Sequence, residues 1–407
     1  MSKGYEAKSY YTANYISYTF IYLAYSSIFV ILNNYFPILF FEVLNINRII
    51  LAFIQFLAYS VLLLRPLFAS ITDKYKINGY QRKYYIIFSG YSLAILYIFM
   101  GFTFNSILIF GSFLFLIYMS CTMLDVSTKS LILDISPNSE TKKKNFFFIF
   151  VGQALGGSLP FFLYFFLIND VYSINSWKTL IFCSYFFLIP LLCTLPFIRE
   201  NNQHDTENVI KKSINSNISH NNELNFPKYT RTTLVLLCVF IFLAFSDSIF
   251  AYAFFPFLLN KFGQDSFSLF NFFLIFCFLI SITSSSIGSF VIKKTKPKKI
   301  IFILTPVIGI IYILFTIVPF GFFTILYFVG WSLGTIGNLN ITVYIMKFKK
   351  GNKSVFFHLI ASFRHLSIFI FLPLGTLLSN FIATEHLIIA GAILLNLSLL
   401  PLIFIKL

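Results

Sequence analysis

The sequence predicts an all-α polytopic membrane protein with twelve transmembrane helices in two pseudo-symmetric six-helix bundles and with both termini in the cytoplasm. Three observations predict this fold class: an apolar composition, twelve apolar stretches of helical length, and an unequal distribution of positive charge between alternate loops. Of the 407 residues, 58% are hydrophobic and 11% are charged, whereas a soluble domain has roughly 25% charged residues. This composition excludes a soluble enzyme, a secreted disulfide-rich protein and a disordered chain, and it favours a chain whose exterior is solvated by lipid.

The apolar stretches follow one another along the whole chain. A helix rises about 1.5 Å per residue, so about 20 apolar residues cross a hydrocarbon core of about 30 Å. The predicted spans are Ile16–Phe41, Ile49–Ile71, Tyr84–Phe104, Ser106–Leu131, Phe146–Ile168, Trp177–Ile198, Thr232–Leu258, Phe267–Ile292, Ile300–Pro319, Phe322–Met346, Val355–Leu378 and His386–Ile405. All five Cys lie in these segments without a C-x-x-C pair, which indicates buried apolar residues rather than disulfides or a metal site.

Positive charge tests the number of spans independently. With the N-terminus in the cytoplasm, the inner segments hold 24 Lys and Arg residues, and the outer segments hold Arg48, Lys178 and Lys261. Cytoplasmic loops carry such an excess, and one miscounted span would invert every later loop. The net charge of +16 is therefore explained by membrane topology, and no nucleic-acid partner is expected.

One long polar segment divides the chain into equal halves. We predict an N-terminal six-helix bundle at residues 1–198, a cytoplasmic polar linker at residues 199–231 that is rich in Asn and Ser, and a C-terminal six-helix bundle at residues 232–407. Each half has a basic loop after its second span, at Ala69–Lys83 and Gly288–Lys299. Repeated halves are typical of transporters, whose binding site lies where the halves meet near the midplane.

The first of these basic loops carries a recognisable pattern. A small residue, an acid four positions later and a basic cluster are formed by Ala69, Asp73, Lys74, Arg82 and Lys83. This pattern resembles the signature of the major facilitator superfamily, although Ala replaces the expected Gly and the basic cluster is stretched. The stretched loop and the Asp125–Pro137 segment also resemble the glycoside–cation symporter and folate–biopterin branches.

The resemblance implies a cytoplasmic gate. In the superfamily, the acid at the position of Asp73 pairs with a basic residue and with helix ends across the interface between the halves, and so holds the outward-facing state. Lys74, Arg82 and Lys83 would supply the basic residues, and Asp134 is expected at the cytoplasmic end of the fourth span.

Charges at membrane depth mark the predicted substrate and coupling cavity. An ionisable group near the bilayer centre costs at least about 2.5–3.5 kcal/mol. Asp125 and Lys129 are spaced i,i+4 on one face of the fourth span. Asp247 lies near the middle of the seventh span, and Arg364 and His365 lie near the middle of the eleventh.

We hypothesise that these charges line the cavity, that Asp247 pairs with Arg364, and that Asp125 or Asp247 carries a coupling proton or helps to hold a cation. A permanent Asp125–Lys129 bridge that only fixes the fourth span is the alternative. Arg65 and His358, close to the inner surface, are expected to anchor at the interface.

Uncharged polar and small residues complete the predictions. The candidates for recognition of the solute are Asn33, Asn34 and Tyr35 in the first span, Gln153 in the fifth, and Asn338 and Asn340 in the tenth. The candidates for close helix packing are Gly152, Gly156 and Gly157, with Pro160 bending the fifth span.

The resemblance implies a secondary active transporter that moves a small polar or zwitterionic solute by alternating access, coupled to H+ or another cation such as Na+. An uncoupled exporter or facilitator, and a non-transporting sensor or lipid scramblase, stay open as alternatives. A membrane transferase is disfavoured because the outer acidic residues are scattered and no H-E-x-x-H, G-x-S-x-G or D-x-D run occurs. We expect no catalytic residue, metal or cofactor, and a monomer in the plasma membrane whose partners are lipid and the solute.

Overall fold

The structure is a computed structural model. It describes residues 2–200 apart from 45, 104–105, 136–138 and 169–172, and residues 257–400 apart from 259, 264, 295–296, 347–357, 360, 363–364, 366–368, 371–372, 375–376, 379–380 and 398. The described residues are almost entirely helical, as the sequence predicts.

The first half contains nine α-helical segments in the described part of the chain. They are α1 (Ser2–Val30), α2 (Phe36–Ile38), α3 (Arg48–Ser60), α4 (Arg65–Lys74), α5 (Lys83–Met100), α6 (Ile107–Ile135), α7 (Ser139–Leu167), α8 (Ile174–Ser184) and α9 (Leu188–Thr194). Two π-helical turns, Ile31–Tyr35 and Leu39–Val43, flank α2, and 3-10 turns at Val61–Leu64, Tyr185–Phe187 and Leu195–Phe197 join or end the later segments. The second half contributes α12 (Cys277–Lys294), α13 (Pro297–Phe315), α14 (Phe320–Met346) and α16 (Thr384–Leu397).

Membrane-spanning helices of the described residues fall where the sequence predicts them. Among the described residues, seven helices are long and apolar enough to span a bilayer, and the segments Asp265–Leu274 and Leu279–Gly288, bent by 45°, form one more if they count as a single span. Lys299–Phe315 and Thr384–Leu397 are shorter apolar helices. Together these helices match predicted spans one to six, eight, nine, ten and twelve. The seventh and eleventh predicted spans lie largely outside the described residues.

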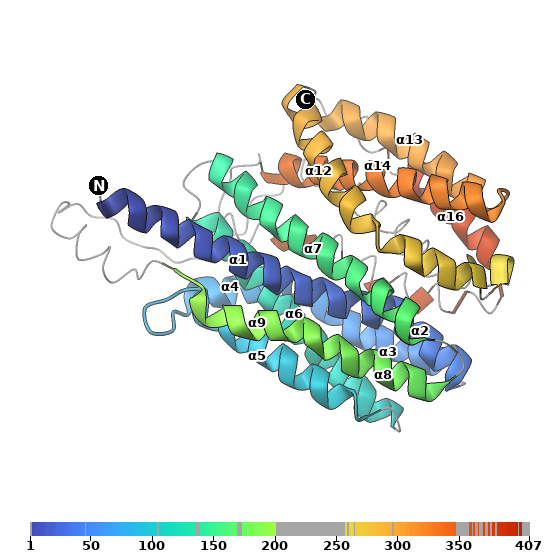
Figure 1. Cartoon of the computed structure of the whole chain (residues 1–407), viewed down its shortest axis with the longest axis horizontal. Coiled ribbons are helices and arrows are strands. Elements are labelled where there is room, and N and C mark those ends of the chain that lie inside the picture. Colours follow the sequence, from blue (N-terminus) through green and yellow to red (C-terminus); the bar gives the residue numbers. More distant parts are fainter. Residues whose placement is uncertain are drawn as a thin grey trace.

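The helices form two groups (Figure 1), with α1 to α9 in one and α12, α13, α14 and α16 in the other. Within the first group α1 packs on α7 and α5 packs on α6, and within the second α12 and α13 pack on α14. Contact between the two groups runs along α7 and α12. Many large apolar side chains are exposed on the outer faces of the helices, among them Phe53, Phe88 and Leu108, as expected for surfaces that face lipid.

Candidate functional site

A cluster of charged side chains lies inside the first group of helices. The Asp125 carboxylate on α6 accepts from Arg65 Nη1 on α4 at 2.5 Å, from Lys129 Nζ at 2.8 and 3.1 Å, and from the Tyr22 hydroxyl on α1 at 2.6 Å. Asp125 and Arg65 are each 1% exposed, and the Lys129 side chain is 19% exposed. The expected i,i+4 pair of Asp125 and Lys129 is therefore present, within a larger cluster that joins three helices.

Arg65 is the residue whose position differs most from expectation. We predicted an anchor at the membrane interface, but the side chain is buried and pairs with Asp125. Pro66 has no backbone N–H to donate to the carbonyl of Leu62, so the chain cannot continue as a regular α-helix at this point. It tightens into the 3-10 turn Val61–Leu64, and α4 then starts at Arg65. This break places the guanidinium at the start of a new helix beside α6.

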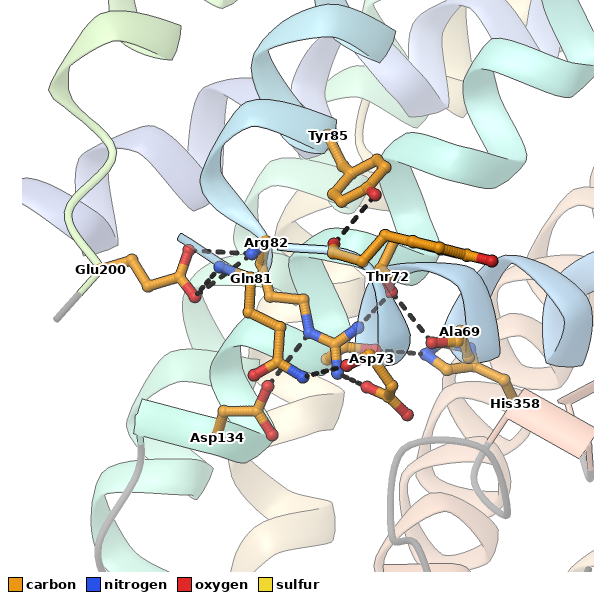
Figure 2. A network of polar contacts seen from close by, with 11 residues as sticks. Ala69, Thr72, Asp73, Gln81, Arg82, Tyr85, Asp134, Glu200 and His358 are labelled. Carbon is orange, nitrogen blue, oxygen red and sulfur yellow. Dashed lines mark hydrogen bonds and ion pairs between the residues drawn. The ribbon is translucent and has the colours of Figure 1, made fainter. Parts of the chain in front are cut away.

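A second polar network lies at the end of the bundle predicted to face the cytoplasm, and Arg82 is at its centre (Figure 2). Its guanidinium donates to Asp73 and Thr72 on α4, and to Asp134 in the last turn of α6 at 3.1 Å. The side chain is 1% exposed. Burial lowers the pKa of Arg82 from its usual value, and the nearby carboxylates of Asp134 and Glu200 oppose that shift. The guanidinium thus joins the ends of α4, α5 and α6.

A tight turn accounts for the stretched basic loop. Ile77 and Tyr80 exchange backbone hydrogen bonds at 2.9 and 3.0 Å, and Asn78 and Gly79 between them have φ values of 52° and 80°. Asn-Gly is the pair that best tolerates two consecutive positive φ angles. The five residues from Lys76 to Tyr80 therefore fold back on themselves and return Arg82 to the end of α4.

Glu200 fixes the start of α5, a role that we did not predict. Its carboxylate accepts from the backbone N–H groups of Gln81 at 3.0 Å, Arg82 at 2.9 Å and Lys83 at 2.7 Å (Figure 2). The first N–H groups of a helix have no partner within the helix, and the helix dipole favours a negative charge there. Glu200, the second residue of the predicted linker, therefore contacts the start of α5, and the bounds of the linker stay a prediction.

The neighbouring residue also holds the chain to α1. Asn14 Nδ2 donates to the carbonyl oxygen of Arg199 at 3.0 Å, and the Arg199 N–H donates to Asn14 Oδ1 at 2.9 Å. This reciprocal pair joins residues 185 positions apart in sequence.

The other residues of the predicted gate lie around this network. Ala69 is fully buried, and its carbonyl accepts from the Thr72 hydroxyl at 3.0 Å. The ammonium groups of Lys74 and Lys83 lie over the rings of Tyr75 and Tyr80, at 5.4 and 5.3 Å from the centroids. The ion pair of Asp73 is with Arg82, within the same half. The predicted pairing of Asp73 across the interface between the halves stays a prediction.

Contacts between the halves involve polar and aromatic residues. The Tyr35 hydroxyl donates to Asn271 Oδ1 at 3.0 Å, and both side chains are fully buried. Tyr35 also stacks on Tyr164, with ring centroids 4.7 Å apart, and Tyr164 meets the edge of Phe267. Tyr35, a predicted recognition residue, thus holds the two halves together.

His358 provides another contact between the halves. Its Nε2 lies 3.1 Å from the hydroxyl of Ser130 on α6, and the side chain is fully buried. We expected His358 at the membrane interface, and this expectation is wrong because the residue packs against the first half, near the Asp125 cluster.

The uncharged polar residues predicted to recognise the solute differ in their contacts. Asn33, in the π-helical turn Ile31–Tyr35, accepts from the hydroxyls of Tyr59 at 2.6 Å and Tyr118 at 2.7 Å. It therefore holds the first, second and fourth spans together. Asn34 and Gln153 are partly exposed, and the side chain of neither makes a hydrogen bond with the described residues.

The small residues of α7 also differ from one another. A Cβ atom at Gly152 would lie 2.3 Å from the carbonyl oxygen of Thr19, and one at Gly156 would lie 2.1 Å from that of Leu23, both on α1. At Gly157 a Cβ atom would meet nothing within 4 Å in the described part of the structure, so its expected packing role stays a prediction. Pro160 lies inside α7 and is buried.

Several predicted residues of the cavity are not described in the structure. Asp247 and Arg364 lie outside the described residues, so their pairing stays a prediction, and for Asn338 and Asn340 the structure describes only the backbone of α14. His365 is helical and partly buried.

Comparison with known proteins identifies the fold. No protein-family model and no curated protein sequence matches the chain. The chain is similar to the crystal structure of a D-xylose-proton symporter, with a TM-score of 0.70, 12% sequence identity, and coverage of 95% of this chain and 97% of the symporter. At this identity the likeness concerns the fold and not the substrate. Since the symporter is a major facilitator transporter, the chain is a multi-pass membrane protein with the major facilitator fold.

Proposed function

We propose that the protein is a secondary transporter that moves a small polar solute across the membrane by alternating access of its two bundles, coupled to H+ or another cation. The observation that carries the proposal is the buried cluster of Asp125, Arg65, Lys129 and Tyr22. Three ionised groups inside a bundle surrounded by lipid are costly to insert. Such groups are typical of solute and ion pathways, and the fold, shared with a proton symporter, supports the same function.

The contacts of Asp125 bear on which acid carries the coupling ion. Its two oxygens accept from two cations and one hydroxyl, and a carboxylate offers about four lone-pair sites. A proton on Asp125 would therefore compete with three donors. We propose that Asp125 positions Arg65 and Lys129, and that Asp247, the second acid at membrane depth, carries the coupling proton or binds the cation.

Transport by purified protein in liposomes tests the proposal. A thermal-shift screen over sugars, amino acids, pterins, nucleosides and carboxylates selects the solute. Uptake driven by a proton or sodium gradient and counterflow exchange are then measured separately. Asp247→Asn is expected to abolish gradient-driven uptake and to keep counterflow, whereas Asp125→Asn is expected to lose both because the cluster no longer holds its cations. Asp265→Asn, at an exposed position, is the matched control and is expected to behave as the unmodified protein.

Each other outcome points to a different function. Uptake that follows only the solute gradient would indicate a facilitator or an uncoupled exporter. Binding of a solute without counterflow would indicate a sensor, and movement of labelled lipid would indicate a scramblase. Gradient-driven uptake that survives in Asp247→Asn would refute the assignment of Asp247. We further propose that the protein acts as a monomer in the plasma membrane, which fractionation and mass measurement in detergent would check.

A further inference from the structure

A buried aromatic cluster joins the two halves at the end of the bundle predicted to face outward. Tyr35 stacks on Tyr164 with ring centroids 4.7 Å apart, and Trp177 makes an edge-to-face contact with Tyr164 at 5.9 Å. Phe267, from the second half, makes another edge-to-face contact with Tyr164 at 5.8 Å. Each of these four side chains is at most 1% exposed. Aromatic pairs in these geometries attract each other, so this outer aromatic cluster stabilises the contact between the halves.

The halves also touch at the opposite end, through Ser130 and His358. Tyr164 lies three residues before the end of α7 at Leu167. Ser130 lies five residues before the end of α6 at Ile135. Because α6 runs toward the predicted cytoplasmic side and α7 runs away from it, the two contacts lie at opposite ends of the bundle. Two halves that rock about a central site break their contact at one end and keep it at the other, so the outer aromatic cluster is the contact that separates when the outer side opens.

The two stacked tyrosines differ in what their hydroxyl groups meet. The Tyr35 hydroxyl donates to Asn271 Oδ1 at 3.0 Å, and Asn271 Nδ2 donates to the carbonyl oxygen of Phe267 at 2.8 Å, which fixes the amide toward Tyr35. The Tyr164 hydroxyl is buried and has no hydrogen-bond partner among the described residues. A buried hydroxyl that is paired adds to stability, whereas one without a partner lowers it.

Separation of the halves at this end changes the energies of the two hydroxyls in opposite directions. Opening breaks the hydrogen bond between Tyr35 and Asn271, so this bond favours the closed state. Opening also admits water, which gives the Tyr164 hydroxyl the partner that it lacks in the closed state, so this hydroxyl favours the open state. The closed state is thus stabilised by one tyrosine hydroxyl and destabilised by the other.

From these contacts we infer that Tyr35 and Tyr164 form the outer closure of the transport path, in which the Tyr35 hydroxyl holds the halves together and the Tyr164 hydroxyl makes their separation easier. The inference rests on the proposed function, because alternating access is what requires the two ends to open in turn. It assigns opposite roles to two residues of the same type in one stacked pair.

Hydrogen exchange of backbone amides, measured by mass spectrometry on the full chain in lipid nanodiscs, tests the inference. Residues 265–271 and the last turn of α7 report on the outer end, and the last two turns of α6 report on the inner end. Amides that exchange through a local opening exchange faster when the open state is more populated. Since rocking closes one end when it opens the other, a change of state moves the two readouts in opposite directions, whereas a general loss of stability moves both the same way.

The two tyrosines are each replaced by phenylalanine, which keeps the ring and removes only the hydroxyl. Tyr35→Phe is expected to speed exchange at the outer end about two- to tenfold, as loss of one hydrogen bond predicts, and to slow it at the inner end. Tyr164→Phe is expected to slow exchange at the outer end at least about fivefold, because a buried group without a partner is removed. For the same reason Tyr164→Phe keeps the fold even if Tyr35→Phe does not.

Two further variants serve as comparisons. Ser130→Ala removes a hydroxyl from the contact with His358, so it is expected to speed exchange at the inner end and to slow it at the outer end. Tyr97→Phe is the matched control, because the Tyr97 hydroxyl lies 2.8 Å from the Ser184 hydroxyl, with both residues buried within the first half. It is expected to leave the balance between the two ends unchanged.

The failure of the inference and the failure of the proposed function give different results. If Tyr35→Phe and Tyr164→Phe change exchange at the outer end in the same direction, or if neither changes it, the closure is overturned while counterflow can still show transport. A shift in Tyr97→Phe like that in Tyr35→Phe also overturns the closure, because the effect is then not specific to the contact between the halves. If the two tyrosine variants shift the ends in opposite directions and no solute shows counterflow, the closure stands and the proposed transport function fails.

Discussion

Gly156 and Gly157 of α7 provide a test of the packing between α1 and α7, in which Gly157 is the control. A Cβ atom at Gly156 would lie 2.1 Å from the carbonyl oxygen of Leu23 and 2.8 Å from its backbone carbon atoms. A carbon atom and a carbonyl oxygen approach each other to about 3.3–3.6 Å in favourable contacts. Gly156→Ala therefore forces the backbones of α1 and α7 apart by about 1 Å, and no flexible side chain is present to give way.

The expected magnitude follows from two opposing effects. Overpacking of a well-packed interface lowers stability by about 1–3 kcal/mol, whereas replacing Gly by Ala inside a helix raises it by about 0.8–1 kcal/mol. At Gly157 only the second effect operates, because a Cβ atom there meets nothing within 4 Å among the described residues. Since helix propensity is the same for both substitutions, Gly157→Ala is expected to be more stable than Gly156→Ala by about 1–3 kcal/mol.

Melting temperatures of the purified variants in detergent check this prediction. We expect Gly157→Ala to melt at or above the temperature of the unmodified chain, and Gly156→Ala to melt below it. Gly152→Ala is expected to behave as Gly156→Ala, since its Cβ atom would lie 2.3 Å from the carbonyl oxygen of Thr19. Equal melting temperatures for Gly156→Ala and Gly157→Ala would show that α1 and α7 do not pack as described.

Three further predictions concern the two polar networks. Glu200→Ala removes the carboxylate that caps α5, so we expect a loss of about 0.5–2 kcal/mol and faster hydrogen exchange of the backbone amides at the start of α5; unchanged exchange would contradict the capping role. Asp125→Asn leaves the buried Arg65 and the partly exposed Lys129 without their carboxylate, so we expect a loss of about 3–5 kcal/mol, and a double-mutant cycle with Arg65→Met is expected to show coupling, while strict additivity would exclude a direct contact. Arg82→Lys keeps the charge but replaces the planar guanidinium, whose donors point in several fixed directions, by a compact ammonium group, so we expect a lower melting temperature, whereas Lys83→Arg next to it is expected to leave stability unchanged.

The transmembrane spans and the contact between Asp125 and Lys129 could be predicted from the sequence because both depend on residues that are close together in the chain. The length of each apolar stretch sets the helix, and the distribution of basic residues sets its direction. The contact between Asp125 and Lys129 needs only the geometry of one helix. The packing of Gly152 and Gly156 was also expected from their spacing alone.

The partners of Asp125 and Arg82 could not be predicted in the same way, because they come from other helices. Arg65 lies nine residues before the end of α4 at Lys74, and Asp125 lies ten residues before the end of α6 at Ile135. At about 1.5 Å per residue both are about 14–15 Å from the same side of the membrane. Matching depths would therefore have suggested this pair, and the Arg65-Pro66 break would have supported it.

The capping role of Glu200 was not predicted because Glu200 is the second residue of a polar segment whose composition is typical of a linker. A carboxylate just beyond a predicted span gives no sign of which helix it caps. The Asn78-Gly79 turn, in contrast, carries a readable signal, and it places Arg82 beside Asp73. The two residues on either side of the stretched loop could thus have been paired from the sequence.

Arg199 and Glu200, which follow the last helix of the first group, bind back to earlier helices of that group. Arg199 exchanges two hydrogen bonds with Asn14 of α1, and the Glu200 carboxylate accepts from the start of α5. These contacts all lie before residue 201. A chain cut after residue 200 would keep all of these hydrogen bonds in its first fragment, so the two halves could be produced as separate polypeptides and combined in one membrane.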